Sequence, residues 1–139
     1  MIIQGMCDSF RGELFQGIHN FNTDTIKVAL YSNTTATLNS TTTVYTSVGE
    51  ISGTGYTAGG EAMTGQSITT VVGASWINWA NPSWPGASFS ADGAMFYNAS
   101  KGNRAIMVLN FGVTRFFNSV SNSLILPDPT ASTALLRLA

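Results

Sequence analysis

Alternation of apolar and polar positions predicts β-strands along most of the chain. Residues 25–32 alternate with Ile26, Val28 and Leu30 on one face, which is the period of a strand. Residues 68–72 and 74–80 form either two strands or one bent strand. Further strands are predicted at residues 44–51, 94–98, 104–111, 120–126 and 134–138.

One pair of these strands has the sequence of a β-hairpin. Residues 94–98 and 104–111 flank a connection at 99–103, which contains glycine and has a length typical of hairpin loops. Both faces of the second strand are largely apolar. We therefore expect this strand to lie centrally in a sheet.

An N-terminal segment has helical periodicity instead. Asp8 is expected to cap a helix of about ten residues, in which Phe10, Leu14 and Ile18 recur at every fourth position. This apolar stripe is expected to pack on the sheets, and an arm that contacts a partner is the alternative. The water-facing side is expected to carry Arg11, Glu13 and Gln16.

These elements predict an all-β fold, an antiparallel β-sandwich or barrel-like domain with one short N-terminal helix. The length of 139 residues suits a single domain over 1–139. Within it, residues 1–22 form the N-terminal arm and helix, and residues 23–139 form the β body.

The composition limits the classes of partner that the protein is expected to bind. Only 9% of residues are charged and the net charge is −1, whereas 32 residues are Thr or Ser, so copies repel each other weakly and permanent assembly into a homo-oligomer is favoured. The six Lys and Arg residues are scattered, which argues against nucleic acid. The sequence lacks an apolar run of roughly 18 residues and a secretory signal, so we expect no membrane span and no export by that route.

Candidate catalytic groups are few. His19 is the single histidine and lies near Asp24 in sequence, but its position at a helix end favours a role in complementing the helix carbonyls over a triad. Glu50 and Glu61 are interpreted as solvated charges rather than paired glycosidase carboxylates. The sequence therefore predicts no enzyme.

Cofactor and metal chemistry is equally sparse. The glycine-rich segment 53–59 lacks the Lys-Ser/Thr pair of a phosphate loop, and we interpret it as a turn. One histidine and the single Cys7 cannot form a closed zinc site. We expect no metal and no cofactor, and we expect Cys7 to be a buried or semi-buried thiol.

Aromatic residues are the candidates for partner contact. Trp76 and Trp79 lie on opposite faces of a strand, so at least one is expected in the core, whereas Trp84 lies in a proline-containing loop and is the most free to anchor a partner. Phe116 and Phe117 are either core residues or a pair that faces a neighbouring subunit. The candidate partner interface thus comprises Phe10, Leu14, Ile18, Trp84, Phe116 and Phe117.

Several segments resemble a family of small tailed-bacteriophage virion proteins. The segments are KVALYS at 27–32, ATL at 36–38, TTTVY at 41–45, GEISGTGYTAGG at 49–60, MT at 63–64, ADGAMFYN at 91–98, GNRA at 102–105 and VLNFG at 108–112. The resemblance covers about residues 9–139 and is most specific at GTGYTAGG. The tryptophan-rich stretch 78–84 and residues 115–117 depart from it.

The resemblance implies a structural part of the phage particle and carries over no catalytic residue. The expected role is a capsid decoration (cement) protein, made in the host cytoplasm, that binds the major capsid protein on the outside of the shell alongside copies of itself. A tail, adaptor or baseplate component is the alternative within the particle. A carbohydrate-binding module that stacks a tryptophan on sugar rings is the alternative from another class, and a hydrolase is the least favoured reading.

Overall fold

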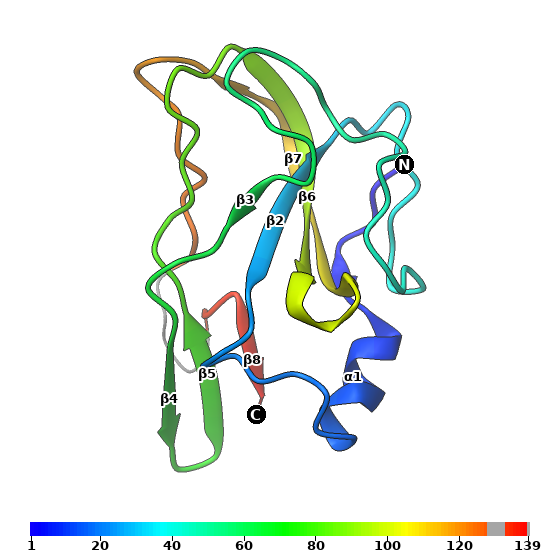
Figure 1. The fold of residues 1–139 in the computed structure, drawn as a ribbon, viewed down its shortest axis with the longest axis vertical. Helices are drawn as coiled ribbons and strands as arrows, with labels where there is room; N and C mark the ends of the chain where they lie inside the picture. Colours follow the sequence, from blue (N-terminus) through cyan, green and yellow to red (C-terminus); the bar gives the residue numbers. More distant parts are fainter. Residues whose placement is uncertain (128–132, 139) are drawn as a thin grey trace.

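Two antiparallel β-sheets and one short α-helix form the described part of the chain, residues 1–127 and 133–138, in the computed structural model (Figure 1). The fold is all-β and sandwich-like, as the sequence predicts. The elements are β1 (Gly5–Met6), α1 (Asp8–Phe15), β2 (Ile26–Tyr31), β3 (Glu61–Ala62), β4 (Ser67–Val71), β5 (Ala74–Asn78), β6 (Phe89–Asn98), the 3-10 helix η1 (Ala99–Lys101), β7 (Arg104–Phe117) and β8 (Leu136–Leu138).

The larger sheet is built around the hairpin of β6 and β7. Its strand order is β1-β7-β6-β2-β3, and the smaller sheet has the order β4-β5-β8. The predicted hairpin is confirmed, with both strands longer than the apolar pattern indicates. The predicted segments 68–72 and 74–80 form two strands, β4 and β5, which are joined by a turn of Val72 and Gly73, where Gly73 has a φ of 82°.

The core fills the space on both sides of β2, most of whose residues are buried. Phe96 lies opposite Val28 in the larger sheet, and Trp79 stacks on Phe96 with ring centroids 6.3 Å apart. Phe21 contacts the edge of Trp79 at 6.1 Å. These rings connect the larger sheet to the segment that leaves the smaller one.

The glycine-rich loop covers another part of the larger sheet, and Glu50 holds it there. The Glu50 carboxylate accepts hydrogen bonds from the hydroxyls of Tyr45 and Tyr56, at 2.6 and 2.7 Å, and from the Gly59 amide at 2.7 Å. The Tyr97 hydroxyl donates to the Gly59 carbonyl at 2.6 Å. The segment is a turn, as predicted, but the interpretation of Glu50 as a solvated charge is wrong.

The N-terminal helix is shorter than expected. Its N-cap is Cys7 rather than Asp8, and it ends at Phe15, so Ile18 lies beyond it. Glu13 is buried rather than water-facing, because it binds partners described below. The α-helix has eight residues, and among the residues described no helix is long and apolar enough to span a bilayer.

Two predicted strands do not form. In residues 44–51, only Val44 and Glu50 make β-bridges, each isolated, to Arg104 and Tyr31. Residues 120–126 are irregular, with one bridge between Ser123 and Ser83. The predicted C-terminal strand is confirmed as β8, which pairs with β5.

Candidate functional site

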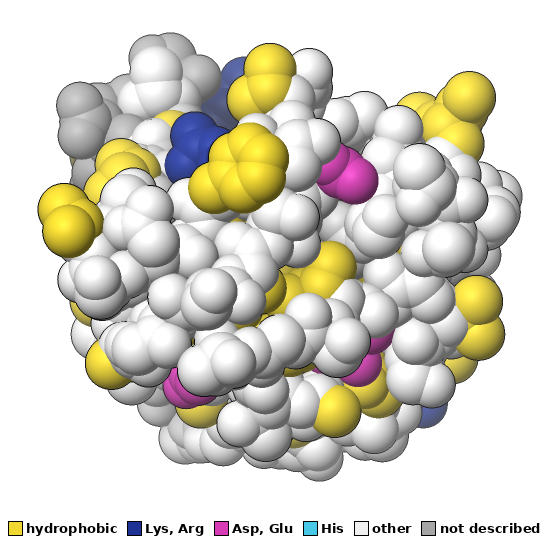
Figure 2. Space-filling view, turned by 90° about the horizontal axis from the view of Figure 1, so that it is seen from above, with side chains coloured by type: hydrophobic (Ala, Val, Ile, Leu, Met, Phe, Trp, Pro, Cys, Tyr) yellow, Lys and Arg dark blue, Asp and Glu magenta, His cyan; other side chains and the backbone are white. Residues whose placement is uncertain are grey.

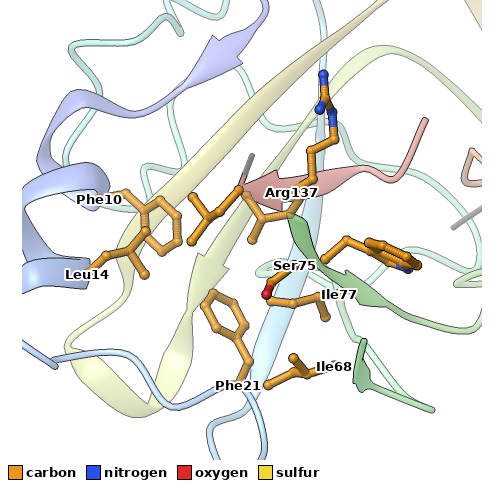
Figure 3. Close-up of a pocket in the computed structure, with 10 residues that line it drawn as sticks. Phe10, Leu14, Phe21, Ile68, Ser75, Ile77 and Arg137 are labelled. Atoms are coloured by element: carbon orange, nitrogen blue, oxygen red, sulfur yellow. The ribbon is translucent and has the colours of Figure 1, made fainter. Parts of the chain in front are cut away.

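An apolar groove lies between α1 and the smaller sheet, with a volume of about 160 Å³. Figure 3 shows the labelled side chains arranged around it, with Phe10 and Leu14 on the helix and Ile68 and Ile77 on the strands. Phe21, from the segment between α1 and β2, closes one side. The lining is completed by Ser75, Trp76, Leu136, Arg137 and Leu138.

Strand register explains why the smaller sheet presents apolar side chains to the groove. Ile68 lies opposite Ile77, which in turn lies opposite Leu136. Residues paired across antiparallel strands share one face of the sheet, so these three side chains form a row. Leu138, two residues after Leu136, lies opposite Ser75 on the same face.

Other residues at the same end of the molecule add exposed apolar surface. Phe15, the last residue of α1, is 96% exposed, and Val72 at the β4–β5 turn is fully exposed. Ile68 and Leu138 are about half exposed. In Figure 1, α1, this turn and β8 all lie toward the same end of the molecule. We call the groove and Phe15, Val72 and Leu138 the apolar end.

The opposite end of the molecule has a different surface. Figure 2 shows it from above as mostly uncharged polar and backbone atoms, with hydrophobic side chains in separate groups and few charges. Phe116, near the end of β7, is 73% exposed.

A buried polar network lies behind the groove and is centred on His19, whose side chain is fully buried. Nε2 of His19 lies 3.1 Å from Oε1 of Glu13, and Nδ1 lies 2.9 Å from Nδ2 of Asn98. Because an amide nitrogen only donates, Nδ1 accepts and the ring proton is on Nε2. Asn98 also donates to Asp24 at 2.8 Å, and Arg104 donates to Glu13 at 2.6 Å.

The network stabilises both of its carboxylates as anions. Burial raises the pKa of Glu13, but hydrogen bonds from His19 and Arg104 outweigh it, so the pKa lies below the ordinary value. Burial likewise raises the pKa of Asp24, but hydrogen bonds from the Asn20 amide and Asn98 outweigh it, and that pKa is also lowered.

This network stabilises the wall of the groove, and its polar groups are hydrogen-bonded to one another. The His19 ring contacts Phe10 and Phe21, both of which line the groove, at centroid distances of 4.9 and 6.1 Å. Its nitrogens bind Glu13 and Asn98, so the predicted role in complementing helix carbonyls is wrong. His19 and Asp24 are linked indirectly, because Nδ2 of Asn98 donates hydrogen bonds to both side chains.

The predicted interface residues are separated by the fold. Phe10 and Leu14 line the groove, although Phe10 is buried. Ile18 is half-buried and lines a different hollow, with Lys101 and Arg104. None of the three therefore projects as an arm.

Trp84 and Phe117 are core residues, so their prediction as partner contacts is wrong for this folded chain. Trp84 is fully buried, with its ring centroid 5.4 Å from that of Phe117 and 6.2 Å from that of Phe89. Of the six predicted interface residues, Phe116 alone is exposed. The carbohydrate-binding alternative loses the tryptophan on which it rested.

Sequence reasoning missed the residues that form the other wall of the groove. These are Phe21, Ile68, Ile77, Leu136 and Leu138. Apart from Phe21, which lies between α1 and β2, these residues are in predicted strands, but the sequence pattern does not show which strands pair and so does not reveal a shared face.

The residues described contain no group of three or more His, Cys, Asp or Glu side chains placed to hold a metal ion. Comparison of the chain with protein-family models, curated proteins and solved structures gives no match.

Proposed function

We propose that the protein is a structural component of a tailed-phage particle, and that it is a decoration protein bound to the outside of the major capsid lattice. The observation that carries the proposal is the apolar end, where an open groove and protruding hydrophobic side chains occur together. The resemblance of about residues 9–139 to virion proteins suggests the particle, and the apolar end suggests the surface that makes the contact.

The physical argument starts from the cost of leaving this surface in water. A fully exposed phenylalanine loses about 1.5–3 kcal/mol of favourable burial. Phe15 and Val72 are both exposed, at the same end of the molecule as a groove with an apolar lining. Contiguous exposed apolar surface typically marks a protein contact. A capsid surface would cover it in many symmetric copies.

Binding of this kind stabilises the shell through linkage. A protein that binds only the intact lattice favours that state in proportion to RT ln(1 + [L]/Kd), so occupancy increases resistance to rupture. The low charge of the chain, 9% of residues, also reduces repulsion between copies crowded on one surface.

The experiment adds the purified chain to phage shells that lack it and measures bound copies and rupture temperature. Wild-type chain should bind throughout the lattice and raise the rupture temperature. Phe15→Ser should raise the dissociation constant about tenfold or more, because one buried phenylalanine is worth at least about 1.4 kcal/mol; bound copies should therefore fall when the chain is added at a concentration near the wild-type dissociation constant.

Val113→Ser is the matched control, because Val113 is also an exposed apolar residue but lies on β7, outside the apolar end; it should bind as wild type does. Equal occupancy for Phe15→Ser and wild type would contradict the proposed contact. Density at a single vertex or on the tail would contradict the decoration role and favour the tail or adaptor alternative.

A further inference from the structure

Strand β4 has an open edge that no described residue pairs with. The smaller sheet has the order β4-β5-β8, so β4 is hydrogen-bonded on one side, and all five of its residues are exposed. The other edge strands are shorter: β1 and β3 have two residues each and β8 has three. β4 is therefore the longest edge strand of the described chain.

The register shows which backbone groups are free. Val71 and Ala74 flank the two-residue turn and form the pair next to it, so Val71, Thr69 and Ser67 bond to β5. Ile68 and Thr70 then direct their N–H and C=O groups away from β5. These are two donors and two acceptors, spaced as a second antiparallel strand requires.

The edge also lacks the features that keep edge strands apart. Natural edges are protected by lysine, proline, inward-pointing charges or bulges. The β4 sequence, SITTV, contains neither charge nor proline, and its pairing with β5 is regular over all five residues. Two such strands would therefore meet without electrostatic repulsion.

We propose that β4 pairs antiparallel with β4 of a second copy of this chain, about a two-fold axis that passes between the two Thr69 residues. Centring on Thr69 places Ile68 opposite Thr70 of the other copy, so the free groups of each chain bond those of the other in four hydrogen bonds. A register centred on Ile68 or Thr70 would bring one residue opposite itself and leave part of this set unpaired.

The pairing yields a continuous six-stranded sheet and orients the two molecules. Because the axis is perpendicular to the sheet, the faces that carry Ile68 and Ile77 lie on the same side in both copies. The two grooves then lie on the same side of the joined sheet. This dimer forms from the purified chain alone and does not depend on the proposed role in a phage particle.

A charge-swap experiment tests the pairing. Residues 69 of the two copies face each other in a non-hydrogen-bonded pair, with Cα atoms about 4.5 Å apart. Thr69→Asp and Thr69→Lys each place like charges directly opposite, which destabilises a strand pair. Sedimentation equilibrium should show a dimer for wild type and an increase of at least about tenfold in the dimer dissociation constant for each variant.

Mixing the two variants should restore dimers as heterodimers, because the charges are then opposite. Thr69→Asn, which matches the shape of the aspartate without its charge, should dimerise as wild type does, and circular dichroism confirms that each variant folds. A wild-type chain that stays monomeric at millimolar concentration overturns the proposal. So does a Thr69→Asp variant that dimerises normally, or a mixture that stays monomeric.

Discussion

Gly60 shows how closely the glycine-rich loop approaches the larger sheet. Its φ of +78° lies in the left-handed region, which residues other than glycine rarely adopt. A Cβ atom added there would overlap the carbonyl oxygen of Val28 and lie 2.8 Å from the Cα of Ala29. Both neighbours are backbone atoms of β2, so the strand itself would have to move.

We therefore predict that Gly60→Ala lowers the free energy of unfolding by about 3 kcal/mol or more, because backbone strain and overpacking add. Gly102→Ala is the matched control: Gly102 has a φ of +65° but nothing within 4 Å of an added Cβ. It should cost about 1–2 kcal/mol. Urea denaturation measures both, and equal losses would contradict the close approach.

Single side chains also show what a local pattern leaves open. Trp84 lies two residues after Pro82 and directly before Pro85, which suggests an exposed loop. The loop instead folds over the core, and the indole packs against Phe89 and Phe117. Its N–H has no hydrogen-bond partner among the residues described, so the side chain contributes to the core through apolar packing. Neighbours distant in sequence decide this burial.

At the scale of elements, α1 is attached by polar contacts as well as apolar ones. Glu13 connects the helix to Arg104 at the start of β7 and to His19, which lies beyond the C-terminal end of the helix. Removing its carboxylate leaves the Nε2–H of His19 buried without an acceptor, which is costly.

We predict that Glu13→Ala lowers the free energy of unfolding by about 2–3 kcal/mol. Glu61→Ala is the control, because Glu61 is half-buried and the described contacts give its side chain no hydrogen bond; it should cost no more than about 0.5 kcal/mol. Thermal denaturation compares the two, and a negligible loss for Glu13→Ala would show that the network adds nothing to stability.

Local apolar patterns predict most of the strands, but they are not sufficient on their own. β2, the β4–β5 pair, the β6–β7 hairpin and β8 follow such patterns, whereas residues 44–51 and 120–126 show comparable patterns without forming strands. In these two segments, bonding to side chains and isolated bridges replaces a ladder; for example, the amide of Leu126 donates to the side chain of Asn81. Only the helix wall of the groove could be predicted, because its residues recur with helical periodicity. The sheet wall depends on which strands pair, and the sequence pattern does not show this.

At the scale of the whole molecule, the ionised carboxylates determine how stability depends on pH. The pKa values of Glu13 and Asp24 are lowered, and so is that of Asp92, which accepts hydrogen bonds from Thr114 and the Asn33 amide. A folded-state pKa below the unfolded one gives stability that is present above the unfolded value and lost as the pH falls.

We predict that the free energy of unfolding is insensitive to these groups between pH 7 and pH 5, and falls below pH 4.5, the ordinary value for Glu13. Denaturation in urea at pH 7, 5, 4 and 3 measures the dependence. Asp92→Asn should reduce the slope below pH 4 because it removes one of the titrating groups. Stability that rises on acidification would contradict the assignment.

The burial of Cys7 affects how the protein behaves when many copies lie close together. It is the only cysteine, it is fully buried immediately before α1, and burial raises the pKa of its thiol to about 11. A protonated, inaccessible sulfur reacts slowly with oxidants and with other thiols. Neighbouring molecules can therefore crowd together without covalent crosslinking, whether their surroundings are reducing or oxidising.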